Sequence, residues 1–117
     1  MKLTFWGASR SVTESKHILT NDSGKNILLD CGLFKGMGED TETLNKNWGF
    51  NPEEIDYVTL SHAHIDHTGL LPKLVKDGFK GKIYATAATV DLCEIMLMDS
   101  ALRLYQNVGI LKLSRYF

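Results

Sequence analysis

Most of the information in this chain lies in one short segment, Ser61-His62-Ala63-His64-Ile65-Asp66-His67-Thr68-Gly69. The sequence contains four histidines, and three of them fall within six residues of this segment. Imidazole and carboxylate groups are the preferred ligands of zinc and similar divalent metals. The segment lies between a predicted strand and a predicted helix, which is the context expected for such a motif. It therefore predicts a metal site, and a metal-free, solvated loop is the alternative.

The spacing within this segment suggests how the ligands would be divided. His62 and His64 are two residues apart at the end of a strand, so both side chains leave on the same side. Asp66 and His67 are expected in the following turn, just before a helix, where they can curl back beside the first pair. The segment could then supply two ligands to one ion and two to a neighbouring ion.

The flanking sequence alternates between apolar runs and turn-forming residues. Strands are expected at 2–6, 17–20, 26–30, 57–61 and 82–85, with a hairpin turn at 21–25. Residues 31–49 form a long predicted loop with one helical turn near 43–45, and a short helix is expected to start at 51–54. Helices are expected at 69–76 and 87–101, the second with Val90, Leu92, Cys93, Met96 and Leu97 facing inward. This order of elements predicts a layered fold of the α/β or α+β class.

The overall composition is that of an ordinary globular domain. The chain has 117 residues, 13 basic and 14 acidic, so its net charge of -1 gives no electrostatic sign of nucleic-acid binding. It contains neither an apolar run long enough for a membrane span nor the pattern of a signal peptide, and we expect neither. Cys31 and Cys93 make no disulfide framework and are expected in the core, which favours a reducing, cytoplasmic setting.

The pattern His62-x-His64-x-Asp66-His67 resembles the signature of the metallo-β-lactamase fold hydrolases. Two flanking segments, Leu28-Leu29-Asp30-Cys31-Gly32-Leu33-Phe34-Lys35-Gly36 and the run from His62 to Pro72, resemble the β-CASP branch of RNA-processing exonucleases and endonucleases. The likeness covers residues 1–101. It implies the N-terminal part of an αββα sandwich, with RNA as the partner and two zinc ions as the cofactor.

The resemblance also assigns roles at the matching positions. His62 and His64 would ligate the first zinc, and Asp66 and His67 the second. Asp66 and Asp30 would serve catalysis: Asp66 by holding the attacking water, and Asp30 by orienting the site through hydrogen bonds. The alternative for Asp30 is a carboxylate that only caps its strand.

The reaction implied is hydrolysis of RNA phosphodiesters by a hydroxide that two zinc ions activate. Two other functions stay open. One is a glyoxalase-like hydrolase of thioesters or other small molecules, and the other is a truncated fragment with no catalysis.

A complete site of this family needs further ligands and an inserted domain. No histidine follows His67, and His17 is expected to be a half-buried strand residue. We therefore expect the chain alone to bind metal poorly, to have little or no activity, and to self-associate through an uncovered sheet face. Residues 102–117 lack acidic side chains and a clear period. They are either a frameshifted tail or a genuine C-terminal strand.

Overall fold

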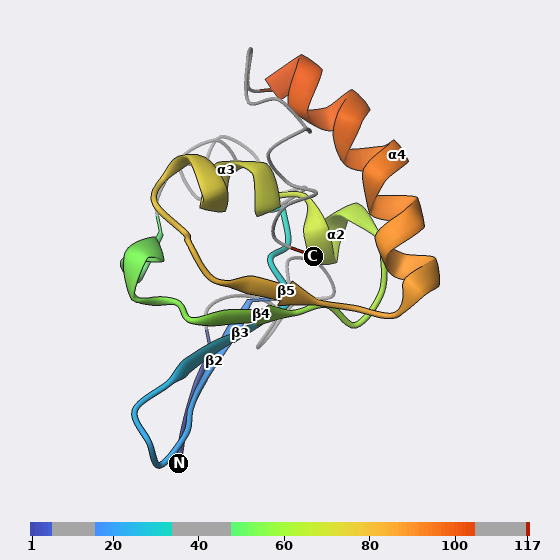
Figure 1. The fold of residues 1–117 in the computed structure, drawn as a ribbon. Coiled ribbons are helices and arrows are strands. Elements are labelled where there is room, and N and C mark those ends of the chain that lie inside the picture. Colours follow the sequence, from blue (N-terminus) through green and yellow to red (C-terminus); the bar gives the residue numbers. More distant parts are fainter. Residues whose placement is uncertain (6–15, 34–47, 105–116) are drawn as a thin grey trace.

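Five strands form one mixed sheet whose spatial order follows the order along the chain (Figure 1). The structure is a computed structural model that describes residues 1–5, 16–33, 48–104 and 117, with backbone only at 98–104. The strands are β1 (Lys2–Phe5), β2 (His17–Thr20), β3 (Asn26–Leu29), β4 (Tyr57–Thr59) and β5 (Lys82–Tyr84). The helices are the 3-10 helix η1 (Pro52–Glu54) and the α-helices α2 (Ile65–Thr68), α3 (Leu71–Lys76) and α4 (Ala87–Leu104). The predicted layered α/β class is confirmed.

The first three strands are antiparallel and the last three are parallel. Each strand begins at its predicted residue, and β3, β4 and β5 end one or two residues earlier than expected. The predicted hairpin joins β2 to β3, where the Asn21 side chain accepts hydrogen bonds from the amides of Ser23 and Lys25. Gly24 has a φ of 84°, which suits glycine in this turn. The helical turn predicted near 43–45 lies outside the described residues.

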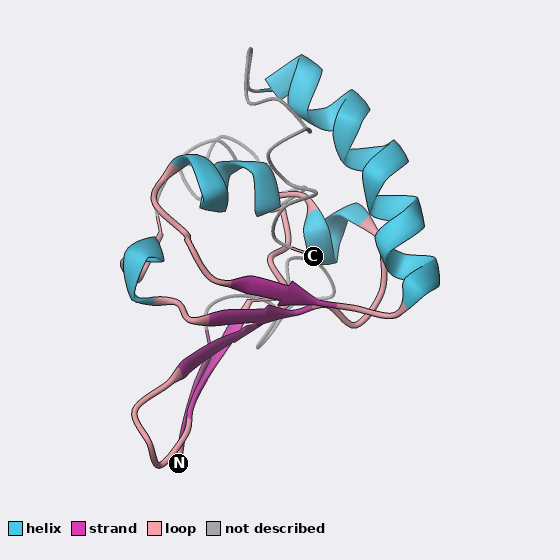
Figure 2. Ribbon diagram, in the orientation of Figure 1, coloured by secondary structure: helices cyan, strands magenta, loops and turns pink. Residues whose placement is uncertain are grey.

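Helices α2, α3 and α4 all lie on the same side of the sheet (Figure 2). Beneath them one row of side chains crosses four strands in register: Ile18, Leu28, Val58 and Ile83. These residues are buried, together with Leu70, Leu71, Leu74, Phe79, Cys93 and Leu97 from the helical side. Each large apolar side chain buried in this way contributes roughly 1.5–3 kcal/mol relative to full exposure. The core therefore packs one face of the sheet against the helices.

The helix predicted at 69–76 is observed as α3, which begins two residues later than expected, and a separate helical turn, α2, precedes it. Helix α2 starts at Ile65, so Asp66 and His67 lie on a helical turn and not in a loop before the helix. Pro72 lacks the amide that would continue the ladder from Thr68, which explains the break. Gly69 lies at the break, where an added Cβ would lie 2.8 Å from the Cβ of Leu33. This close approach brings the segment after β3 against α2.

Helix α4 buries a narrower stripe than the sequence predicts. Thr89, Cys93 and Leu97, spaced four residues apart, are buried, whereas Leu92 is 51% exposed and Ile95 is 71% exposed. The prediction that Leu92 faces inward is wrong, because the part of α4 whose side chains are described contacts the core along one edge. The helix continues to Leu104, three residues past Ala101. The boundary between the domain and the tail, predicted at Ala101, stays a prediction. No helix in the described part of the chain is long and apolar enough to span a membrane.

Candidate metal centre

The candidate site lies where two neighbouring parallel strands end. Asp30 follows β3, and Ser61 and His62 follow β4, so these residues meet at the same edge of the sheet. Helix α2 comes directly after them and carries Asp66 and His67. The carboxyl ends of parallel strands are a common place for functional residues in α/β folds.

Asp30 is the centre of the hydrogen bonds at this edge. Its Oδ1 accepts a bond of 2.7 Å from the Ser61 amide, and its Oδ2 lies 2.7 Å from Ser61 Oγ and 2.8 Å from His67 Nδ1. The residue is 6% exposed and has a φ of 62°, which aspartate tolerates better than most residues. The carboxylate therefore does more than cap β3, because it also holds the His67 ring.

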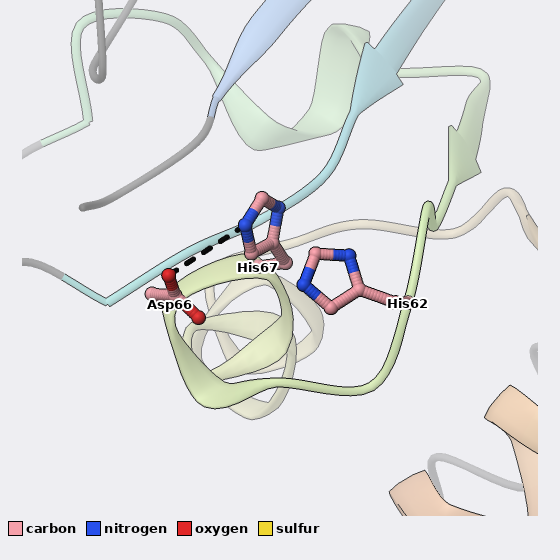
Figure 3. A group of neighbouring side chains, drawn as sticks. All are labelled: His62, Asp66 and His67. Atoms are coloured by element: carbon pink, nitrogen blue, oxygen red, sulfur yellow. Dashed lines mark ion pairs between the residues drawn. The ribbon is translucent and has the colours of Figure 1, made fainter. Parts of the chain in front are cut away.

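His62, Asp66 and His67 form one group (Figure 3). Each offers a ligand atom, and these three atoms lie within 4.8 Å of one another. The rings of His62 and His67 are 4.0 Å apart at their centroids, and His67 Nε2 is 3.6 Å from Asp66 Oδ2. All three residues are partly buried. Within the described part of the chain, this is the group that could hold a metal ion.

His64 lies beside this group but is not part of it. It is exposed at the N-terminus of α2, and its ring centroid is 4.8 Å from that of His62. The geometry thus places His62 with Asp66 and His67, while the sequence pairs His62 with His64. The division of the four ligands between two ions stays a prediction.

The donor set fits a divalent metal of the zinc type. Two imidazole nitrogens and one carboxylate oxygen are ligands that zinc accepts, and three protein ligands are typical of a catalytic zinc. Ligands on one tetrahedral zinc lie about 3.4 Å apart, so the three atoms need to close only slightly around an ion. His67 already uses Nδ1 toward Asp30, which leaves Nε2 available.

The sequence alone did not indicate a role for Ser61, the first residue of the motif. Its hydroxyl touches Asp30 and lies 2.9 Å from His62 Nδ1. A hydroxyl directly before a candidate ligand was the signal that could have indicated the contact with His62.

The other candidates for chemistry lie elsewhere. His17 is a partly buried strand residue whose ring packs edge-on against Phe5, as expected for packing. Cys31 and Cys93 are buried and unpaired, which confirms the expectation that they belong to the core. Burial raises the pKa of Cys31 to about 12 and that of Cys93 to about 11. Both thiols therefore stay protonated at neutral pH.

Residues 17–110 match the sequence profile of the metallo-beta-lactamase superfamily. The chain therefore belongs to this superfamily, and it carries the superfamily's metal-binding His/Asp motif.

Several curated relatives sharpen this assignment. The chain is 48% identical over 100 residues to Ribonuclease TTHA0252 of Thermus thermophilus, covering 86% of this chain and 22% of the relative. It is 38% identical over 104 residues to Integrator complex subunit 11 of Danio rerio, covering 85% of this chain and 17% of that protein. These matches confirm the resemblance to the β-CASP branch. The chain spans about a fifth of the length of such relatives.

Solved structures show the same fold. The short form of human tRNase Z matches with a TM-score of 0.53 and 26% identity, over 86% of this chain and 40% of that one. A metallo-beta-lactamase from Cronobacter sakazakii matches with a TM-score of 0.52 and 24% identity, over 74% of this chain and 30% of that one. The mixed sheet and its helices thus form part of a metallo-β-lactamase fold.

Proposed function

We propose that this chain is the metal-binding part of a β-CASP-like ribonuclease that hydrolyses RNA phosphodiesters, and that alone it has little or no activity. The observation that carries the proposal is 48% identity over 100 residues to a ribonuclease, combined with the cluster of His62, Asp66 and His67. The partner proposed is RNA, and the cofactor proposed is zinc.

The residues of the site suit this chemistry. His62, Asp66 and His67 would hold the ion, with His64 close enough to join a second one. Bound zinc would supply a Lewis acid for the phosphoryl oxygen and a water of lowered pKa. The Asp66 carboxylate would accept a proton from an attacking water. Asp30 fixes the orientation of the His67 ring through its bond to Nδ1.

The incomplete ligand set supports the low activity proposed for the chain alone. The described residues contribute three clustered ligand atoms, enough for one ion but not for two. The two unpaired cysteines also suit a reducing compartment, and we propose the cytoplasm as the setting.

A chimera tests the proposal directly. This chain would replace the matching segment of the Thermus thermophilus ribonuclease, and the purified protein would be assayed on labelled RNA and on a glutathione thioester. We expect the chimera to cleave RNA and leave the thioester intact, while the chain alone cleaves neither. His62→Ala in the chimera should remove the activity, and Asp22→Asn, in an exposed turn, should not.

The competing functions predict other results. A chimera that folds and binds zinc but hydrolyses only the thioester would favour the glyoxalase-like alternative. A chimera that folds and binds zinc but cleaves neither substrate would favour a non-catalytic role.

A further inference from the structure

Ser61 is a polar residue at the site that the proposed function leaves without a task. Its hydroxyl lies between a buried carboxylate and a candidate ligand, 2.7 Å from Asp30 Oδ2 and 2.9 Å from His62 Nδ1. Its backbone amide also donates to Asp30 Oδ1, so the residue is anchored at two points. The two hydrogen bonds to Asp30 therefore fix the position of the hydroxyl.

The direction of these hydrogen bonds follows from the number of protons available. An ionised carboxylate can only accept, and a hydroxyl has one proton to donate. Asp30 Oδ2 must therefore receive the Ser61 proton. The hydroxyl oxygen is left with lone pairs only, and it can approach His62 Nδ1 as an acceptor. The proton of a neutral His62 ring then belongs on Nδ1.

The His67 ring also carries its proton on Nδ1, because it contacts Asp30 directly. Its Nδ1 lies 2.8 Å from Asp30 Oδ2 but 3.4 Å from Ser61 Oγ, so its proton points to the carboxylate. The Asp30 carboxylate therefore determines the position of the proton in two rings, directly in His67 and through the Ser61 hydroxyl in His62. In both rings the free lone pair is on Nε2, which a metal can use.

We propose that Ser61 is a positioning residue. Because its hydroxyl donates to Asp30, it accepts a hydrogen bond from Nδ1–H of His62, and this leaves Nε2 of that ring free to bind the metal. The proposal rests on the metal site of the proposed function but not on any substrate. Hydrogen-bond partners of this kind typically change metal affinity by about 10–100-fold.

The test reads the proton position in the metal-free chain. With 15N-labelled histidine, long-range proton–nitrogen spectra at about pH 8 show which ring nitrogen carries the proton, because ordinary imidazoles are neutral there. We expect Nδ1–H for both His62 and His67 in the unaltered chain. In Ser61→Ala, His62 should shift toward Nε2–H while His67 stays as it was. Ser61→Thr, which keeps the hydroxyl, should restore the original state.

Zinc affinity provides the second readout. Competition with a chelating dye should show weaker binding in Ser61→Ala by about 10-fold or more, and near-normal binding in Ser61→Thr. Ser23→Ala, which removes an exposed turn hydroxyl, is the matched control and should change neither spectrum nor affinity. RNA cleavage is not measured, so loss of the proposed ribonuclease function would leave these results intact.

Three outcomes would overturn the proposal. The first is an unaltered chain with the His62 proton on Nε2, which needs no variant and stands even if Ser61→Ala fails to fold. The second is a Ser61→Ala chain in which His62 keeps Nδ1–H. The third is a change at His67 as large as that at His62, because the hydroxyl would then act on the whole site and not on one ring.

Discussion

Asp30 Oδ2 lies 2.8 Å from Nδ1 of His67, although the two residues are 37 positions apart in the chain. This contact joins the end of β3 to the short helix that carries two candidate ligands. The Asp30 backbone adopts a φ of 62° at this point, a conformation usually found at glycine and less often at asparagine or aspartate. Unusual backbone at such a place is typical of functional sites, where the surrounding structure holds it.

Replacing this carboxylate should weaken metal binding. In Asp30→Asn the side chain keeps one acceptor oxygen, but its amide would face donors from Ser61 and His67. We expect zinc affinity to fall about 10–100-fold and the free energy of unfolding to drop by about 1–3 kcal/mol. Competitive zinc titration and thermal melting measure the two effects, with Asp22→Asn as the control. Unchanged affinity in a folded variant would mean that Asp30 does not orient the site.

His62 and His64 should differ in how much each contributes to zinc affinity in the isolated chain. His62 belongs to the cluster with Asp66 and His67, whereas His64 is exposed beside it. We expect His62→Ala to reduce affinity for the first zinc ion at least tenfold, and His64→Ala to reduce it much less. Isothermal titration with zinc measures both. Equal losses would instead support the pairing of His62 with His64 on one ion.

The two cysteines should resist modification while the chain is folded. Burial holds the pKa of Cys31 at about 12 and that of Cys93 at about 11. Only the thiolate reacts with alkylating reagents, so labelling at about pH 8 should be slow in buffer and fast in denaturant. Mass spectrometry after timed exposure to iodoacetamide gives the rates. Rapid labelling of Cys31 without denaturant would contradict its placement in the core.

Asp77 should contribute to stability only above acidic pH. Burial opposes its ionisation, but hydrogen bonds from Lys73 and from the indole of Trp48 outweigh this and lower its pKa. A lowered pKa stabilises the fold above the ordinary value of about 3.9. That stabilisation is lost as the pH falls through the folded value.

Comparison with Asp77→Asn tests this sign. We expect the variant to be less stable by about 1 kcal/mol near neutral pH, with the difference shrinking as the pH falls below about 4. Denaturant unfolding across the pH range measures it, and Asp22→Asn serves as the control. A difference that grows toward acid pH would have the wrong sign.

The face of the sheet opposite the helices should drive self-association of the isolated chain. Phe5 and Tyr84 are 58% and 57% exposed on this face, and α2, α3 and α4 lie on the other side (Figure 2). We expect light scattering to show a mass that rises with concentration, and Phe5→Lys with Tyr84→Lys to shift the chain toward monomer. Ile95→Lys, on α4, should have no such effect. If Ile95→Lys alone gave monomer, the sheet face would not be the contact.

Local patterns in the sequence were enough for much of the fold. The strand starts and the turn at 21–25 depend on alternation and turn chemistry, which act over a few residues. The His62–His67 motif was equally visible, because three histidines so close together are rare in packing. These features could be predicted since the forces behind them are local.

The features that were missed depend on contacts distant in sequence. The exposure of Leu92 is decided by which edge of α4 contacts the core, and not by its own period. The grouping of His62 with Asp66 and His67 depends on α2 starting at Ile65, which places Asp66 and His67 on a helical turn. The contact of Ser61 with Asp30 spans 31 residues, so no local pattern contains it.

The pairing of β3 with β4 has a consequence for folding errors. Leu29 faces Thr59 in this register, and Asp30 and Ser61 then meet just beyond the last pair. A slip of one residue reverses the face to which every side chain of a strand points. The Asp30 carboxylate would then turn away from Ser61 and His67. Zinc affinity thus becomes an assay of correct strand alignment, able to distinguish the native chain from a misaligned one of equal strand content.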